Sequence, residues 1–144
     1  MLLNLEFSSE IPIYKQIHDQ IVLCIAKGYL CAGEKLPTLR ALANETGINM
    51  MTVNKAYQLL KQEGYITGDR RGGTVVTGQF ANVPVEKVLA ELGLPAATAR
   101  LSGMPRETWL EYCGMAYDGT SDVTSDLMND GTSGKTSDAK GGGS

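Results

Sequence analysis

Amide, hydroxyl and cationic side chains gather between residues 49 and 55, in a pattern that fits the recognition of DNA. Thr52 and Asn54 carry groups that form hydrogen bonds to base edges or phosphates, and Lys55 can bind a phosphate. The apolar side chains of the same stretch can contact the methyl groups of thymine. The candidate contacts in this stretch are Asn49, Met50, Met51, Thr52, Asn54 and Lys55.

Arginines on either side of this stretch are further candidates for contact with DNA. Arg40 precedes it and can bind a guanine or a phosphate through two hydrogen bonds. The run Arg70-Arg71-Gly72-Gly73 places two guanidinium groups beside two glycines, which let a backbone approach DNA closely. We expect this run to enter the minor groove or to grip the DNA backbone.

Two helices separated by a sharp turn are predicted to position these residues. The first runs from the N-cap Thr38 through Glu45, and Gly47 breaks it. The second is capped by Asn49 and ends at Gly64. Its buried face has the spacing i, i+3, i+4, i+7 of a helix, made by Val53, Ala56, Tyr57 and Leu60. Its opposite face carries Met50, Met51, Thr52, Asn54, Lys55 and Gln58.

A hairpin is predicted to follow these helices. Residues 65–67 and 74–77 are rich in β-branched and aromatic side chains and are predicted to be strands, with residues 68–73 as the loop. An earlier helix is expected from Pro12 to Lys27, with His18 as a solvated residue on its polar side. The predicted fold of residues 1–77 is therefore mainly α with a small β-hairpin, a winged helix-turn-helix.

The remaining residues are predicted to form a helical appendage and a tail. In residues 78–117 one amphipathic helix starts at Pro84, and a second runs from Pro105 to about Tyr117. Two short helices with so much apolar surface are expected to form a dimerisation region, although they can also pack on the first domain. Residues 118–144 are dominated by Gly, Ser, Thr, Asp and Lys and are expected to be disordered.

The charge distribution is compatible with DNA binding despite a net charge of −3. Residues 1–77 carry eight Lys/Arg against seven Asp/Glu, a balance of +1. Residues 78–144 carry five Lys/Arg against nine Asp/Glu, a balance of −4. The acidic excess thus lies outside the predicted DNA-binding part, and the weak positive balance favours a dimer with modest non-specific affinity.

Other classes of protein are disfavoured by what the sequence offers. One histidine, no glycine-rich phosphate loop and no cysteine–histidine pairing leave no nucleophile with a base, so no enzyme, cofactor or metal site is expected. No apolar stretch approaches the ~18 residues of a membrane span. Three cysteines without metal-ligand spacing fit a reducing cytoplasm. The alternatives left open are a winged helix that binds protein and a switch that responds to a ligand.

The chain resembles the GntR family of bacterial transcription regulators over roughly residues 7 to 77. The motifs that carry the resemblance are Pro12-Ile-Tyr-Lys-Gln-Ile, Gly33-Glu-Lys-Leu-Pro-Thr-Leu-Arg, Thr52-Val-Asn-Lys-Ala-Tyr and Glu63-Gly-Tyr-Ile. The short appendage is similar to that of the YtrA-like subfamily. The chain departs from the usual pattern of the family at two places. It has Asn49-Met-Met where Asn-Pro-Asn is common, and the tip of its hairpin, the wing, is one residue shorter than usual.

The resemblance implies a cytoplasmic homodimer, most often a repressor, that binds an inverted repeat in double-stranded DNA. It implies DNA contacts at Arg40, Asn49, Met51, Thr52, Lys55, Arg70, Arg71 and Gly72. The resemblance does not identify a small-molecule effector. No effector pocket is expected from the sequence, because about 40 residues can hardly enclose a metabolite.

Overall fold

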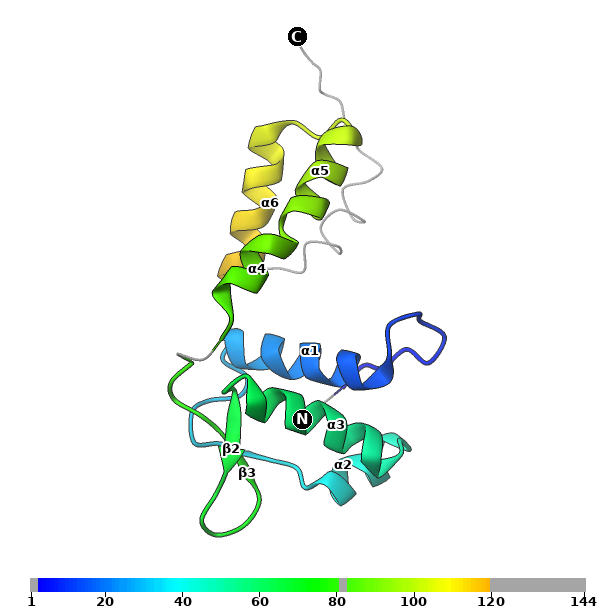
Figure 1. Cartoon of the computed structure of the whole chain (residues 1–144), viewed down its shortest axis with the longest axis vertical. Helices are drawn as coiled ribbons and strands as arrows, with labels where there is room; N and C mark the ends of the chain where they lie inside the picture. Colours follow the sequence, from blue (N-terminus) through cyan, green and yellow to red (C-terminus); the bar gives the residue numbers. More distant parts are fainter. Residues whose placement is uncertain (1–2, 81–82, 120–144) are drawn as a thin grey trace. The chain divides into compact units, whose positions relative to one another are not determined.

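The computed structural model describes residues 3–80 and 83–119 (Figure 1). The chain divides into two compact units, Met1–Val85 and Glu86–Ser144. Asp118 belongs to a helix, and the predicted disordered tail lies outside the described residues from residue 120 onward.

Helix α1 (Ile13–Ala26) forms where the sequence predicted it. Its apolar repeat faces the core: Ile17 and Ile21 are fully shielded from solvent, and Ile13, Cys24 and Ile25 are partly buried. Pro12 precedes the first turn, where its missing N–H leaves no hydrogen bond unmade. Gly28, with a φ of 82°, turns the chain away after the helix ends.

Helices α2 (Leu39–Thr46) and α3 (Met50–Gln62) form the predicted helix–turn–helix. Thr38 Oγ1 accepts a hydrogen bond from the Ala41 N–H at 3.0 Å, which caps α2. Asn49 Oδ1 accepts one from the Met51 N–H at 2.7 Å, which caps α3. Between the helices Gly47 has a φ of 74°, a left-handed conformation that glycine adopts without strain.

A small antiparallel sheet has the strand order β1-β3-β2, formed by β1 (Lys35–Leu36), β2 (Ile66–Gly68) and β3 (Thr74–Val76). Ile66 pairs with Val76 in the predicted hairpin. The sequence predicted only these two strands. The additional strand β1 pairs Leu36 with Thr74 and fixes the hairpin to the segment that leads into α2.

The core of the first unit lies between α1, α2, α3 and the sheet, with α1 packed across α3 (Figure 1). The predicted inward face of α3 is confirmed, since all four of its apolar side chains are buried. The side chains that are fully or almost fully buried here are Ile17, Ile21, Leu42, Val53, Ala56, Tyr57, Leu60, Ile66 and Val76.

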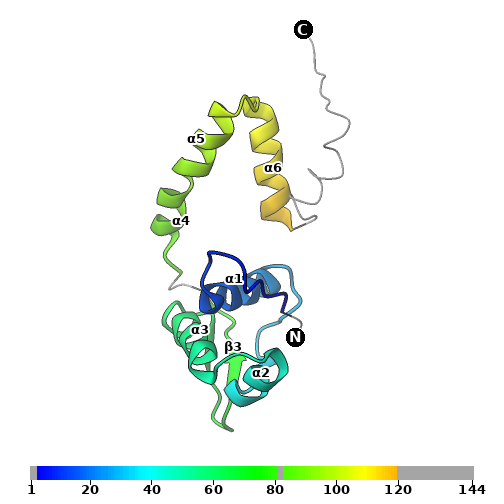
Figure 2. The same ribbon diagram turned by 90° about the vertical axis from the view of Figure 1, so that its right-hand side faces the viewer.

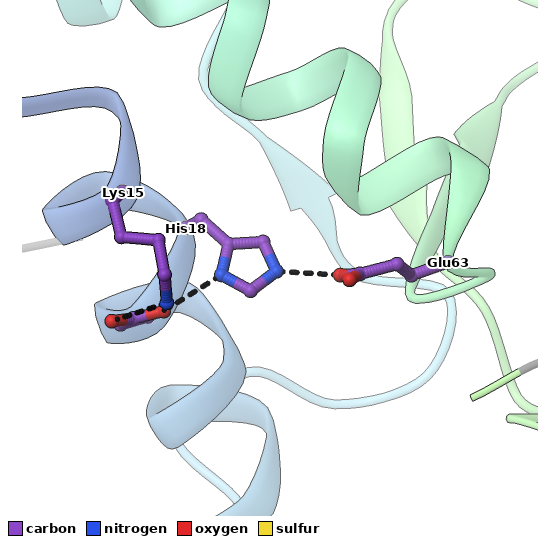
Figure 3. A network of polar contacts seen from close by, with 4 residues as sticks. Lys15, His18 and Glu63 are labelled. Carbon is purple, nitrogen blue, oxygen red and sulfur yellow. Dashed lines mark hydrogen bonds and ion pairs between the residues drawn. The ribbon is translucent and has the colours of Figure 1, made fainter. Parts of the chain in front are cut away.

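The prediction that His18 is a solvated surface residue was wrong. Its side chain is only 12% exposed, and its Nε2 lies 2.5 Å from Glu63 Oε1 at the end of α3 (Figure 3). Its Nδ1 lies 2.8 Å from Asp19 Oδ1, and Lys15 Nζ bonds the same oxygen at 2.8 Å. His18 therefore links α1 to α3. Periodicity could not show this, because Glu63 is 45 residues away.

Between residues 83 and 119 the structure describes three helices where the sequence predicted two: α4 (Val85–Glu91), α5 (Gly93–Leu101) and α6 (Arg106–Asp118). Helix α5 was not predicted separately, because the apolar pattern extended the helix that starts at Pro84 as far as Leu94, which lies in α5 together with Gly93 and Pro95. Gly93 and Pro95 both lie in the first turn of α5, where a proline removes no helical hydrogen bond. Helices α5 and α6 meet at a turn and diverge from it (Figure 2).

The helices of the second unit leave most of their apolar side chains exposed. Among its described residues only Ala99 is buried. Tyr117 is 92% exposed and Leu101 87%, and the other large exposed apolar residues of α4–α6 are Val85, Val88, Leu89, Leu92, Leu94 and Leu110. In the described ranges, no helix combines the length and the apolar character that crossing a membrane requires.

Candidate nucleic-acid interface

An exposed ridge runs along the outer face of α3. Met51, Lys55 and Gln58 follow one another at spacings of four and three residues, so they lie on one line of the helix. All three are exposed, and Met51 is 79% accessible. Gln58 was predicted to lie on this face but was not among the predicted DNA contacts. Its place one turn beyond Asn54 was the signal that could have included it.

Thr52 and Asn54 lie on opposite flanks of this ridge. Residues two positions apart are separated by about 200° around a helix axis of 3.6 residues per turn. Both side chains are half-buried, whereas the ridge between them is exposed. Gln58 Nε2 donates to Asn54 Oδ1 at 3.4 Å, a long hydrogen bond. The two flanks therefore present a hydroxyl on one side and an amide pair on the other.

The turn between α2 and α3 forms a hollow in the surface. Its lining is Arg40, Ala43, Asn44, Gly47, Ile48 and Met50. Arg40 is exposed, so its guanidinium is available at the rim. Asn49, next to the hollow, uses its side-chain oxygen as the cap of α3, which leaves its NH₂ group to donate elsewhere. The structure thus brings Arg40 and Met50 to one site.

The tip of the hairpin is a tight turn that presents two cations. The Gly72 N–H donates to the Asp69 carbonyl oxygen at 3.0 Å, which makes Arg70 and Arg71 the central residues of a β-turn. Gly72 and Gly73 have φ values of 85° and 91°, which favour glycine. Both arginine side chains are exposed. In Figures 1 and 2 this loop and α2 lie at the end of the first unit away from α1.

Acidic charge beside the wing is partly neutralised within the protein. The Asp69 carboxylate lies 3.8 Å from Lys35 Nζ, the side chain of strand β1. This exposed pair adds little to stability. It does place a cation opposite the one carboxylate among residues 68–73, so the turn keeps its positive character.

Lys55 does not stand free as the sequence implied. Its Nζ lies 4.1 Å from the centroid of the Tyr14 ring on α1, a cation–π contact. Such a contact at an exposed site is worth about 0.5–1 kcal/mol. A phosphate must therefore draw the ammonium from Tyr14 or bind it in place. Of the other candidates on α3, Asn54 accepts the long hydrogen bond from Gln58 described above.

Tyr57 connects α3 to the segment that begins α2. Its hydroxyl donates to the Pro37 carbonyl oxygen at 2.7 Å, across 20 positions of sequence. Burial raises the pKa of the Tyr57 hydroxyl to about 12, because the phenolate would be poorly solvated. Through this bond Tyr57 holds the ridge of α3 and Arg40 of α2 in a fixed relation.

Replacing Tyr57 with phenylalanine is expected to lower stability by about 1 kcal/mol near neutral pH, since the hydrogen bond to Pro37 can no longer form. The native phenol keeps its proton until about pH 12, whereas the unfolded phenol loses it near 10, so wild-type stability falls between these values. At one pH unit above 10 this term amounts to about 1.4 kcal/mol. Urea unfolding of both proteins at pH 8 and 11 measures it.

The phenylalanine variant itself serves as the control for other alkaline effects. Burial and, to a smaller extent, the charge of Glu63 also raise the pKa of Tyr65, which both proteins retain. The variant is therefore expected to lose less stability between pH 8 and 11 than the wild type. Equal losses in the two proteins would contradict the role of Tyr57.

No cluster of metal-binding side chains occurs in the part of the chain that the structure describes. The candidate residues are cations, amides, a hydroxyl and methionines, together with glycines that shape the wing. This set suits contacts to phosphates and base edges.

Comparison with known proteins identifies the first unit. The family described as "Bacterial regulatory proteins, gntR family" matches residues 13–76. YtrA from Sulfolobus acidocaldarius, a GntR-family transcription factor of known structure, is 42% identical with a TM-score of 0.56. The alignment covers 66% of this chain and 99% of that one. The chain belongs to the GntR family. Its first unit is the winged helix DNA-binding domain of that family.

Two further relatives are similar to this chain. The HTH-type transcriptional repressor YtrA of Bacillus subtilis strain 168 is 36% identical over 85 residues, which are 59% of this chain and 65% of that protein. The chain spans smaller shares of other curated relatives that it matches. A transcriptional antiterminator from Listeria monocytogenes EGD-e is 27% identical with a TM-score of 0.72, covering 85% of this chain and 92% of that one.

Proposed function

We propose that this GntR-family protein is a homodimeric repressor that binds an inverted-repeat operator in double-stranded DNA. Each subunit places the N-terminal half of α3 in a major groove, and the two grooves lie about 34–36 Å apart along the duplex. Arg70 and Arg71 enter the neighbouring minor groove or grip its phosphates. Thr52, Asn54 and Gln58 are the candidates for reading bases.

One observation carries this proposal: a single unit holds both an exposed ridge on α3 and a turn with two exposed arginines. The wing is fixed to the segment before α2 by strand β1, and α2 is fixed to α3 by the hydrogen bond of Tyr57. A preset arrangement of this kind suits a rigid duplex better than a flexible peptide.

The apolar surface of α4–α6 supports the dimer. Isolated exposed leucines are ordinary, but a row of large exposed apolar residues along one helix face marks an interaction site. In α4, Val85, Val88 and Leu89 lie on one face, and Leu92 continues the stripe. A second copy of the same surface would bury these residues about a twofold axis.

The YtrA of Bacillus subtilis is named a transcriptional repressor, and its similarity to this chain supports repression here as well. Action on chromosomal DNA places the protein in the cytoplasm of a cell without a nucleus. The alternatives of a protein-binding winged helix and a ligand-responsive switch remain as outcomes of the tests below.

Selection of bound fragments from the host genome, followed by footprinting, tests the proposal. We expect protected inverted repeats, and an affinity whose logarithm falls with log[salt] at a slope near −0.9 per phosphate neutralised. Absence of any retarded DNA, together with salt-insensitive affinity for a protein partner, would favour the protein-binding alternative.

Replacement of Thr52 or Asn54 with alanine is expected to weaken operator binding by about 1–3 kcal/mol for each base that the side chain reads. Binding to random DNA should change little, because base contacts carry the sequence preference. Fluorescence anisotropy with operator and scrambled duplexes measures both affinities. Gln62, exposed at the far end of α3, provides the matched control as Gln62→Ala. If Thr52→Ala and Asn54→Ala weaken both duplexes equally, these side chains grip phosphates instead.

A further inference from the structure

A pocket lies at the closed end of the α5–α6 hairpin and contains none of the residues assigned to DNA. Its lining is Ala96, Arg100, Met104, Arg106 and Trp109, and its volume is about 400 Å³. Pockets for small ligands span roughly 300–1,000 Å³. The sequence did not predict this pocket, since about 40 residues were expected to be too few to enclose a metabolite. The unpredicted helix α5 supplies two lining residues.

The helical spacing explains why these side chains converge. Ala96 and Arg100 are four residues apart on α5, and Arg106 and Trp109 are three apart on α6, so each pair shares one face. The two helices meet at the connection that contains Met104 and diverge from it (Figure 2).

The connection between α5 and α6 is closed by backbone hydrogen bonds. The Met104 N–H donates to the Ala99 carbonyl oxygen at 3.1 Å, and the Gly103 N–H donates to that of Arg100, also at 3.1 Å. Gly103 has a φ of 90°, which suits glycine at this reversal. The end of the pocket is thus held by the backbone.

The pocket concentrates positive charge within an acidic unit. Residues 86–119 carry three Lys/Arg against five Asp/Glu, and two of the three cations line the pocket. Within the described residues, neither Arg100 nor Arg106 forms an ion pair or a side-chain hydrogen bond. The rest of the lining is apolar and includes the flat indole of Trp109 and the thioether of Met104.

We propose that this pocket binds a small organic anion, a carboxylate or phosphate monoester joined to a flat apolar body. A guanidinium binds either head group through two parallel hydrogen bonds. The indole face and the methionine accept an aromatic or aliphatic body. Bound there, the anion contacts both α5 and α6. Binding of this anion does not depend on the function proposed above. A change in operator affinity caused by the bound anion would depend on it.

Trp109 is the only tryptophan of the chain, so its fluorescence reports directly on the pocket. The full chain, without DNA, is titrated at constant ionic strength with phenyl phosphate, with benzoate and with neutral benzyl alcohol. We expect a saturable change in emission with at least one of the two anions and none with the alcohol. A response to phenyl phosphate alone identifies a phosphate site, and a response to benzoate alone a carboxylate site.

Variants of the pocket assign the response to its arginines. Arg100→Ala and Arg106→Ala are each expected to weaken anion binding about tenfold or more, as expected for the removal of a charge-assisted hydrogen bond. Arg100→Lys keeps the positive charge but cannot form the two parallel hydrogen bonds of a guanidinium, so we expect an intermediate affinity for the anion. Lys87→Ala removes an equal charge from α4 outside the pocket and should leave binding unchanged. Circular dichroism verifies that each variant is folded.

Three results would overturn the proposal. One is an emission that does not respond to either anion, and another is an equal response to benzyl alcohol. The third is undiminished anion binding by the folded Arg100→Ala and Arg106→Ala variants. If the same variants instead dissociate a dimer, the pocket belongs to the interface between two copies. None of these results affects the DNA-binding proposal, because no DNA is present.

Discussion

Introducing glutamate at Leu89 is expected to convert the protein to a monomer and to weaken operator binding by about 10²–10⁴-fold. Leu89 is 64% exposed in the stripe on α4 that we propose to be covered by a second copy. A carboxylate buried there without a partner opposes association. Loss of the linked second half-site removes the gain that two connected binding events provide, which is typically about 10²–10⁴-fold. Light scattering measures the mass, and fluorescence anisotropy the operator affinity.

Ala90→Glu is the matched control for Leu89→Glu. Ala90 is the next residue on α4 and is exposed, but it points about 100° away from Leu89 and off the apolar stripe. It should remain dimeric with unchanged affinity. Because Leu89 is exposed in the single chain, its replacement should leave the circular dichroism spectrum intact. A dimeric Leu89→Glu variant with native operator affinity would exclude this stripe from the interface.

The double variant Arg70→Ala, Arg71→Ala is expected to weaken binding to operator and random DNA alike, on the order of a hundredfold or more at low salt. Both side chains are exposed at the centre of the wing turn, so the change removes charge without opening the core. A dimer loses four cations. If all four neutralise phosphates, the slope of log affinity against log[salt] flattens by about 3.6, at ~0.9 per phosphate. Titrations at several salt concentrations measure the slope.

Two controls separate the charge of the wing from its shape. Lys27→Ala with Lys87→Ala removes equal charge from exposed sites outside the proposed interface and should leave the slope unchanged. Gly72→Ala keeps both arginines but introduces a side chain where φ is 85°, although space is available for the added methyl group. It should weaken binding without changing the wing's charge. If the double arginine variant keeps the wild-type slope of log affinity against log[salt], Arg70 and Arg71 do not contact phosphates.

The helix–turn–helix could be read from the sequence because its determinants are local. Thr38 and Asn49 cap helices through hydrogen bonds to residues two or three positions away, and Gly47 supplies the turn between them. Strand β1 could not be read, because two residues give no periodicity and their partners lie 38–40 positions away. Helix α5 was not predicted separately, because one apolar pattern runs through α4 and into Leu94 of α5.

The candidate site was predicted as a set of residues, but its geometry was not. Side-chain types identified the cations and amides of α3 and the wing. They could not show that Lys55 lies over Tyr14 or that His18 meets Glu63, since both contacts form only when α1 packs on α3. The pocket beside Trp109 was missed for the same reason, because its lining comes from two helices.

The pairing of Leu36 with Thr74 has a consequence for the spacing of the DNA target. Strand β1 leads directly into α2 and is hydrogen-bonded to strand β3 of the hairpin, so the hairpin tip cannot move independently of the recognition helix α3. The domain therefore holds these two elements at a fixed separation. In the complex that we propose, one base pair inserted between the part of a half-site that contacts α3 and the part that contacts the hairpin tip shifts the latter by about 3.4 Å. Because the domain cannot change the separation between the helix and the hairpin tip by that distance, one of the two contacts must be lost.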